Sequence, residues 1–218
     1  MFTDMAGYTA LLQADERLAL DRRERYWDAL ERHHEAFGGT IVQRLGDGSM
    51  SMFPSSLAAV QAAVAVQQEL APQDVLVRIG VHSGEVVVEP ERLTGDAVNV
   101  AARIESFAVP GGVLLSDAAY EQIKNRSDVV AVPLGRFRLK NVGRAFELFA
   151  VSADGLVVQD ARALEGKGER FARLPSSLPT PAVPLVGRTG ELAALTDLVR
   201  TQRVVTITGP GGVGRRAC

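Results

Sequence analysis

Charged and amide side chains recur in four short segments whose residue types could do chemistry. FTDMAGYT contains Asp4, LGDG contains Asp47, RIGVHSGEV contains Arg78, and GDAVNVAAR contains Asn99 and Arg103. Arg78 interrupts an apolar run, and an unpaired guanidinium is costly to bury, so it needs either a carboxylate partner or an anion such as phosphate. Asn99 and Arg103 are four residues apart and therefore share one face of a helix.

Each of these residues also has an ordinary structural explanation. An Asp near a chain terminus, such as Asp4, is most often solvated or caps a helix. Asp47 precedes a glycine between two β-prone runs, which is typical of a tight turn. His82 has no second His or Cys at ligand spacing, so we interpret it as structural. Asn99 and Arg103 could serve as capping or surface residues.

The periodicity of the first half predicts the elements that must position these residues. From Thr9 to about Phe37, apolar and charged residues alternate at helical spacing, which predicts one or two helices. Residues 40–53 read as a β-hairpin around Gly46, Asp47 and Gly48. An Ala-rich helix should follow over residues 55–70, with Ser55 or Ser56 as its N-cap.

The second half continues the alternation of strands and helices. VLVRIGVHSGEVVV suggests two strands joined by a turn, and GDAVNVAARIESF a helix that Asp96 could cap. VLLS, a helix over residues 118–124 and three further β-prone runs complete an α+β pattern rich in βαβ units.

Composition excludes several classes of function. The chain has 218 residues, of which 46% are hydrophobic, enough for one core of domain size plus a further segment. Lys and Arg (24) nearly balance Asp and Glu (26), so we expect no direct binding to nucleic acid. The single cysteine is Cys218, and neither a long apolar stretch nor a signal peptide is evident, which favours a cytoplasmic protein without membrane contact.

Taken together, the motifs resemble a known enzyme family. FTDMAGYT, LGDG, RIGVHSGEV, GDAVNVAARIES and LGRFRLKNVGRAFELF occur in the order and spacing of the class III adenylyl/guanylyl cyclase catalytic domain. The resemblance covers residues 2 to 151 and implies a ferredoxin-like βαββαβ core with added strands and helices. It also implies conversion of ATP or GTP to a 3′,5′-cyclic nucleotide and pyrophosphate.

The resemblance assigns a role to each matching residue. Asp4 and Asp47 match the two metal-binding Asp residues, which hold two Mg²⁺ or Mn²⁺ ions per site. Asn99 matches the residue that orients the ribose, and Arg103 matches the residue that stabilises charge on the α-phosphate. Arg78 and Lys140 match residues that bind the β- and γ-phosphates. In the family these groups come from opposite subunits, so a homodimer with two equivalent sites is implied.

The chain departs from the family pattern where the base is selected. Gln43 stands where Lys selects adenine or Glu selects guanine, and Arg92 stands where an Asp is usual. Gln can meet either purine edge by flipping its amide, so ATP and GTP both remain candidates. Only Met1 and Phe2 precede Thr3 of the FTD motif, which is less of the first strand than the family normally has. These departures favour an alternative, in which a catalytically weak or inactive domain serves as a dimerisation and regulatory module of a transcriptional regulator.

The last third of the chain differs in character from the first two thirds. We expect the cyclase domain over residues 1–152 and a linker over residues 153–184, Pro-rich at 173–184. Residues 185–218 resemble the opening of a P-loop ATPase module, through PLVGRTGEL and TITGPGGVG. Arg215 and Arg216 stand where the loop needs Lys and Ser or Thr, so we expect a remnant that neither folds alone nor binds nucleotide.

Overall fold

A computed structural model describes residues 1–89, 92–140, 142, 144–164, 167, 169–171, 190, 194–198 and 205. The chain divides into two compact units, Met1–Ala172 and Arg173–Cys218. Most of the expected ATPase-like fragment, including all of TITGPGGVG, lies outside the described residues. The residues of the candidate site all belong to the first unit.

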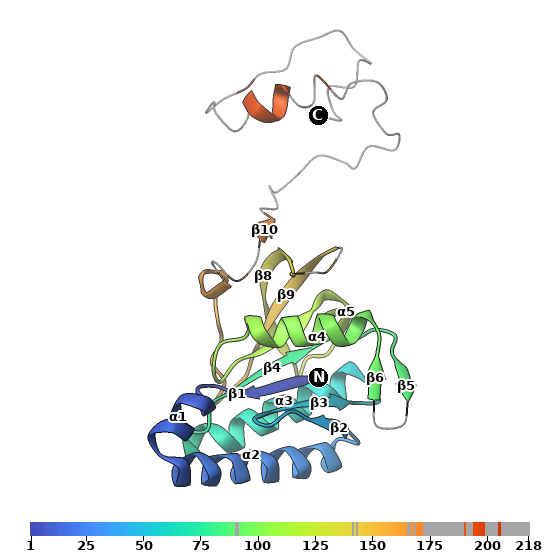
Figure 1. Ribbon diagram of the computed structural model, residues 1–218. Coiled ribbons are helices and arrows are strands. Elements are labelled where there is room, and N and C mark those ends of the chain that lie inside the picture. Colours follow the sequence, from blue (N-terminus) through green and yellow to red (C-terminus); the bar gives the residue numbers. More distant parts are fainter. Residues whose placement is uncertain are drawn as a thin grey trace. The chain divides into compact units, whose positions relative to one another are not determined.

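The first four strands of the main sheet form a ferredoxin-like core. They are β1 (Phe2–Met5), β2 (Thr40–Arg44), β3 (Gly48–Met52) and β4 (Val77–Val81), in the antiparallel order β4-β1-β3-β2. Two helices, α1 (Tyr8–Ala14) and α2 (Glu16–Ala36), follow β1, and α3 (Ser56–Leu70) follows β3. This is the expected βαββαβ arrangement (Figure 1).

Further strands extend the sheet beyond β4. β7 (Val113–Ser116) pairs with β4 in parallel, and β9 (Ala145–Ser152), β8 (Val130–Arg138) and β10 (Glu169–Phe171) continue the sheet antiparallel. A short helix, α5 (Asp117–Glu121), follows β7. β5 (Val87–Glu89) and β6 (Arg92–Thr94) form a separate two-stranded sheet before α4 (Asp96–Phe107). Two 3₁₀ turns, Ala71–Gln73 and Ala161–Leu164, complete the unit.

Local side chains explain where several helices begin. Asp15 ends α1 and caps α2 by accepting a hydrogen bond from the Leu18 N–H at 2.9 Å. Ser55 caps α3 through the Ala58 N–H, as expected from the sequence. The expectation that Asp96 caps α4 is wrong, because Gly95 is the N-cap and Asp96 is the first helical residue. A carboxylate there still favours the positive end of the helix dipole.

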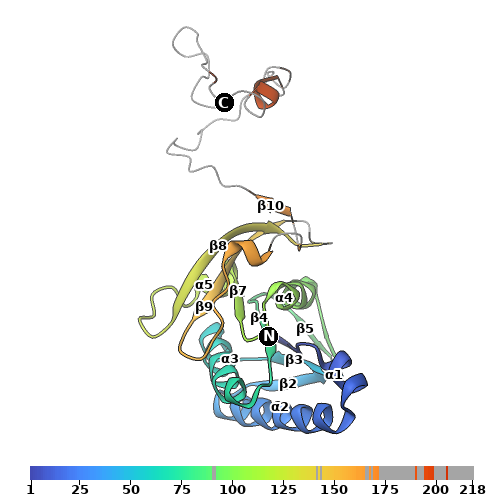
Figure 2. The same ribbon diagram turned by 90° about the vertical axis from the view of Figure 1, so that its left-hand side faces the viewer.

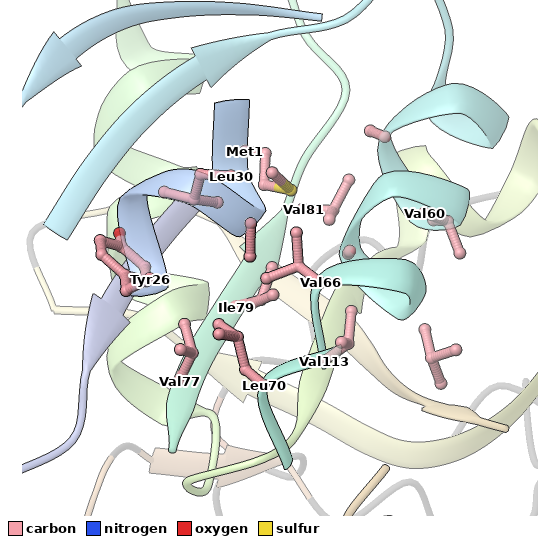
Figure 3. Close-up of a cluster of buried hydrophobic side chains, with 14 of the residues drawn as sticks. Met1, Tyr26, Leu30, Val60, Val66, Leu70, Val77, Ile79, Val81 and Val113 are labelled. Carbon is pink, nitrogen blue, oxygen red and sulfur yellow. The ribbon is translucent and has the colours of Figure 1, made fainter. Parts of the chain in front are cut away.

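Helices cover both faces of the sheet and bury a separate cluster on each (Figures 1 and 2). On one face, α2 and α3 pack against alternate residues of β4, namely Val77, Ile79 and Val81 (Figure 3). On the other face, α4 contributes Ile104 and Phe107 to a cluster with β7, β8 and β9. Because strand residues alternate between faces, Arg78 and Gly80 of β4 point to the α4 side.

Two stretches add to the sequence-based expectation. The two strands expected in VLVRIGVHSGEVVV are present as β4 and β5, and β5 pairs with β6. The stretch after residue 152, where we expected a linker to begin, packs on the domain: Leu164 is fully buried and β10 pairs with β8. Within the described residues, no helix has the length and apolar character needed to cross a membrane.

Candidate active site

The first feature of the site is an ion pair between adjacent strands. Asp4 on β1 lies directly opposite Arg78 on β4 in the antiparallel register, so both side chains point to the same face. A terminal nitrogen of the guanidinium, Nη2, donates to Asp4 Oδ2. The Arg78 side chain is 33% exposed and that of Asp4 is 27% exposed, so both remain reachable from solvent. Asp4 is therefore one carboxylate partner of the kind that an Arg in this strand requires.

The β2–β3 hairpin brings the second carboxylate to the same end of β1. The Met5 N–H donates to the backbone oxygen of Asp47 at 2.9 Å, and Asp4 pairs with Gly48. A Cβ on Gly48 would lie 2.7 Å from the Thr3 oxygen and 3.6 Å from Asp4 Oδ1, so glycine at this position allows the hairpin to lie this close to β1. Two carboxylates at the same end of β1 suit a hard divalent cation whose remaining ligands come from phosphate or water. Among the described residues, no group of three or more His, Cys, Asp or Glu side chains could hold a metal by itself.

A carboxylate on α4, that of Glu105, also contacts Arg78. Oε1 of Glu105 on α4 lies 3.2 Å from Arg78 Nε, and the Glu105 side chain is 14% exposed. α4 can approach this closely because β4 has glycine at position 80, where a Cβ would lie 2.2 Å from the backbone nitrogen of Glu105. Arg78 thus lies between a strand carboxylate and a helix carboxylate.

Burial changes the acidity of this cluster. Loss of hydration is the largest cause that raises the pKa of Glu105 to about 7, and the negative charges of Asp4 and Asp47 add to it. The positive charges of Arg78 and Lys167 act in the opposite direction. Lys167 lies near the end of α4, where its ammonium group donates to the Phe107 and Ala108 carbonyls at 3.3 and 3.4 Å.

The remaining polar pair lies on a different face of α4. Asn99 is exposed and Arg103 is half-buried, whereas Val100, Ala101 and Ile104 are buried. Within the part of the chain that the structure describes, neither the Asn99 nor the Arg103 side chain forms a hydrogen bond or ion pair. The structure therefore brings Asp4, Asp47 and Arg78 together within one chain and leaves Asn99 and Arg103 without a bonded partner there.

The other expected site residues are more widely spread. Gln43 is exposed on β2, beside a register shift between Ile41 and Gln43. Lys140 is exposed in the turn that follows β8. Arg92 is the first residue of β6, and its side chain is outside the described part of the structure.

His82 occupies a structural environment. Its Nδ1 is 2.7 Å from the Ser116 hydroxyl, which also caps α5, and its ring meets Phe146 edge-on. Loss of hydration is the main cause that lowers the pKa of His82 to about 4, so the ring is neutral near pH 7.

Sequence reasoning missed Glu105. The signal was present, because Glu105 follows Ala101 by four residues and so falls on the helix face that Ala101 and Ile104 bury. A carboxylate on such a face requires a partner.

Comparison with known proteins gives these residues a family context. The family described as the adenylate and guanylate cyclase catalytic domain matches residues 1–152. A protein of Rhizobium meliloti (strain 1021) with the provisional name adenylate cyclase 3 is 37% identical over 161 residues, covering 68% of this chain and 27% of the relative. Serine/threonine-protein kinase pkn2 of Myxococcus xanthus is 30% identical over 210 residues, covering 88% of this chain and 24% of the relative. The chain thus spans about a quarter of the length of these curated relatives.

Solved structures share the same architecture. The crystal structure of an adenylate/guanylate cyclase/hydrolase from Silicibacter pomeroyi has a TM-score of 0.65 and 31% identity, over 70% of this chain and 94% of that chain. An adenylate cyclase of Trypanosoma brucei, determined in its monomeric state, has a TM-score of 0.65 at 23% identity, over 78% of this chain and 93% of that chain, a likeness of fold. Since the family match extends over residues 1–152 and includes every strand from β1 to β9, the chain belongs to the adenylate and guanylate cyclase catalytic domain family.

Proposed function

We propose that this domain converts ATP or GTP to the 3′,5′-cyclic nucleotide and pyrophosphate in intracellular signalling. The observation that carries the proposal is the grouping of Asp4, Asp47 and Arg78 at one end of β1, where two carboxylates and a guanidinium are within reach of solvent. Such a group matches the needs of a triphosphate bound with divalent cations.

Asp4 and Asp47 would hold two Mg²⁺ or Mn²⁺ ions, whose donor requirements they fit as two carboxylate ligands at the same end of β1. Bound there, the ions would make the ribose 3′-hydroxyl more acidic and neutralise charge on the phosphates. Arg78 would leave Asp4 for the β- and γ-phosphates, with Lys140 as a second cation for these groups.

A second set of residues would act on the reacting end of the nucleotide. Asn99 would orient the ribose and Arg103 would bind the α-phosphate as negative charge builds on it. Both belong to α4 and would come from the opposite subunit of a homodimer, so an isolated subunit would be inactive. Gln43 and Arg92 would contact the base, and the Gln43 amide could serve either purine by exchanging donor and acceptor.

A second candidate is a catalytically weak or inactive domain that dimerises and regulates a larger protein, including a transcriptional regulator. The Asp4–Arg78 ion pair supports it, because a guanidinium occupies a carboxylate that catalysis needs for a cation.

We also propose that the cyclase domain covers residues 1–152 and that residues 185–218 are a fragment resembling the opening of a P-loop ATPase. We further propose a cytoplasmic location without direct nucleic-acid binding.

Incubation of the purified chain with ATP or GTP and Mn²⁺ distinguishes the two candidates, with both cyclic nucleotides measured. Asp47→Ala is the control, since it removes one of the two carboxylates that would hold the metal ions. Cyclic product well above this control supports the enzyme. Product equal to the control, at concentrations where a dimer is demonstrated, excludes the enzyme and leaves the regulatory module.

A further inference from the structure

We propose that Glu105 is a positioning residue for Arg78, holding its Nε–H on the α4 side of the sheet so that the terminal nitrogens face a bound triphosphate. The inference rests on the proposed function, in which Arg78 binds phosphate and Asp4 binds a cation. Two carboxylates contact one guanidinium at different nitrogens: Asp4 accepts from Nη2, and Glu105 Oε1 lies 3.2 Å from Nε.

The two carboxylates cannot play the same part. A divalent cation on Asp4 would repel the guanidinium and occupy the oxygens that now accept from it. Arg78 would then lose its strand partner, and a long side chain without an anchor samples many rotamers. Glu105 is not one of the two carboxylates that would bind cations, Asp4 and Asp47. It can therefore keep its contact with Arg78 after Asp4 has bound a cation.

The Glu105 contact is incomplete in the present arrangement. Arg78 Nε and Glu105 Oε1 are both buried atoms, and neither forms a hydrogen bond within the described residues, although they are 3.2 Å apart. The guanidinium is turned toward Asp4, which leaves the Nε–H out of line with the Glu105 oxygen. Release from Asp4 would let this N–H align, and buried polar groups gain most from such a bond.

The backbone holds Glu105 in place. Arg78 and Gly80 are two residues apart on β4 and face α4 together. The missing Cβ at Gly80 lets the α4 backbone sit against the strand at Glu105, since a Cβ there would lie 2.2 Å from the Glu105 nitrogen. The carboxylate therefore projects from a rigid helix, as a positioning group requires.

Electrostatic repulsion and positioning of Arg78 predict opposite effects of neutralising Glu105. Removal of a negative charge near a phosphate site should tighten anion binding by reducing repulsion. If Glu105 instead positions Arg78, its neutralisation should weaken binding. A residue that only stabilises the fold would leave the affinity of the folded protein unchanged.

The experiment measures binding of inorganic tripolyphosphate without metal, by calorimetry, to folded protein verified by circular dichroism. Asp4→Asn serves as the background because it frees Arg78 without a cation. We expect Asp4→Asn/Glu105→Gln to bind about tenfold more weakly than Asp4→Asn, equivalent to about 1.4 kcal/mol. Adding Arg78→Gln to both proteins should abolish that difference, because Glu105 acts through Arg78.

Asp4→Asn/Glu69→Gln is the matched control. Glu69 also pairs with a cationic side chain, Arg32, but this pair joins α2 to α3. The affinity of the control variant for tripolyphosphate should therefore equal that of Asp4→Asn. Equal or tighter binding after Glu105→Gln overturns the inference, as does a failure of Asp4→Asn to bind tripolyphosphate. Cyclic nucleotide formation by the unsubstituted chain is assayed separately. If this chain forms no cyclic nucleotide but the variants show the expected order of tripolyphosphate affinities, only the proposed activity is excluded. If it forms cyclic nucleotide but the affinities with and without Glu105→Gln are equal, only the inference about Glu105 is excluded.

Discussion

Asp4 and Arg78 face each other across β1 and β4 and form an ion pair, so a guanidinium neutralises the carboxylate that we expect to bind a cation. The same two residues also belong to a larger charged group, because Glu105 contacts Arg78 from α4 and Asp47 lies in the adjoining hairpin. Cation binding and phosphate binding at this site should therefore be coupled, since each takes one member of an existing pair.

Substitution of Asp4 should weaken the response to metal. Asp4→Asn retains the shape of the side chain but removes one of two carboxylates, and hard cations depend on charged oxygen ligands. We expect the Mn²⁺ concentration for half-maximal cyclase activity to rise by at least about tenfold, a loss of about 1.4 kcal/mol. Asp154→Asn, in an exposed turn after β9, is the control and should leave the metal response unchanged. An unaltered response in Asp4→Asn would contradict the assignment.

Glu105 should make folding stability depend on pH. Its pKa is about 7 in the folded protein, against 4.5 in the unfolded chain, because burial and the charges of Asp4 and Asp47 outweigh Arg78 and Lys167. The folded state therefore binds the proton more tightly. The resulting stabilisation is complete below pH 4.5 and is lost as the pH rises through 7.

Comparison with Glu105→Gln isolates this contribution, since Gln does not titrate. From pH 4.5 to above 7, the free energy of unfolding of the wild type should fall by roughly 3 kcal/mol relative to the variant. Urea unfolding of both proteins across this range provides the measurement. Curves that stay parallel from acid to neutral pH would refute the raised pKa.

A chain of buried hydroxyl groups connects α2 to the strands beneath the site. The Tyr26 hydroxyl is 2.5 Å from Thr3 Oγ1, which is 2.7 Å from Ser49 Oγ. Tyr26→Phe removes one member and leaves Thr3 and Ser49 paired with each other. We expect the free energy of unfolding to fall by about 1–2 kcal/mol, the usual cost of one lost buried hydrogen bond. A double-mutant cycle with Thr3→Val measures the coupling, and additive effects would indicate that the contact contributes nothing.

Much of the fold follows from local patterns in the sequence. The helix capped by Ser55, the hairpin around Asp47 and the strand containing Arg78 all occur where periodicity and turn residues predict them. Local signals suffice because each element has its own caps and alternation. They do not identify the partner of β5, because its pairing with β6 depends on which strand lies beside it in space.

The site was less accessible to sequence reasoning than the fold. That Arg78 needed a partner could be deduced from its apolar strand, but not that the partner is Asp4, 74 residues away in the sequence. Glu105 was overlooked because a Glu near the end of a helix is normally solvent-exposed, although its spacing from Ala101 places it on the buried face of α4. What the sequence did not show is the close approach of α4 to Gly80, which brings Glu105 against β4.

Complementation between inactive variants should reveal whether two chains share each site. Asp4 and Asp47 belong to β1 and the hairpin, whereas Asn99 and Arg103 lie on α4, away from its buried face. If opposite subunits supply the two sets, a heterodimer of Asp47→Ala with Arg103→Ala contains one intact site. Random pairing of equal amounts should then restore about a quarter of wild-type activity, because half of the dimers are mixed and each has one working site.

The matched control combines two variants from the same half of the site. A mixture of Asp47→Ala with Asp4→Ala leaves both sites of every heterodimer without one of the two metal-binding carboxylates, so it should stay inactive. Native mass spectrometry must confirm the mixed dimers in both samples. If the first mixture stays inactive, or the control recovers equally, the two sets of residues do not act across a shared interface, and a site within one chain becomes the better explanation.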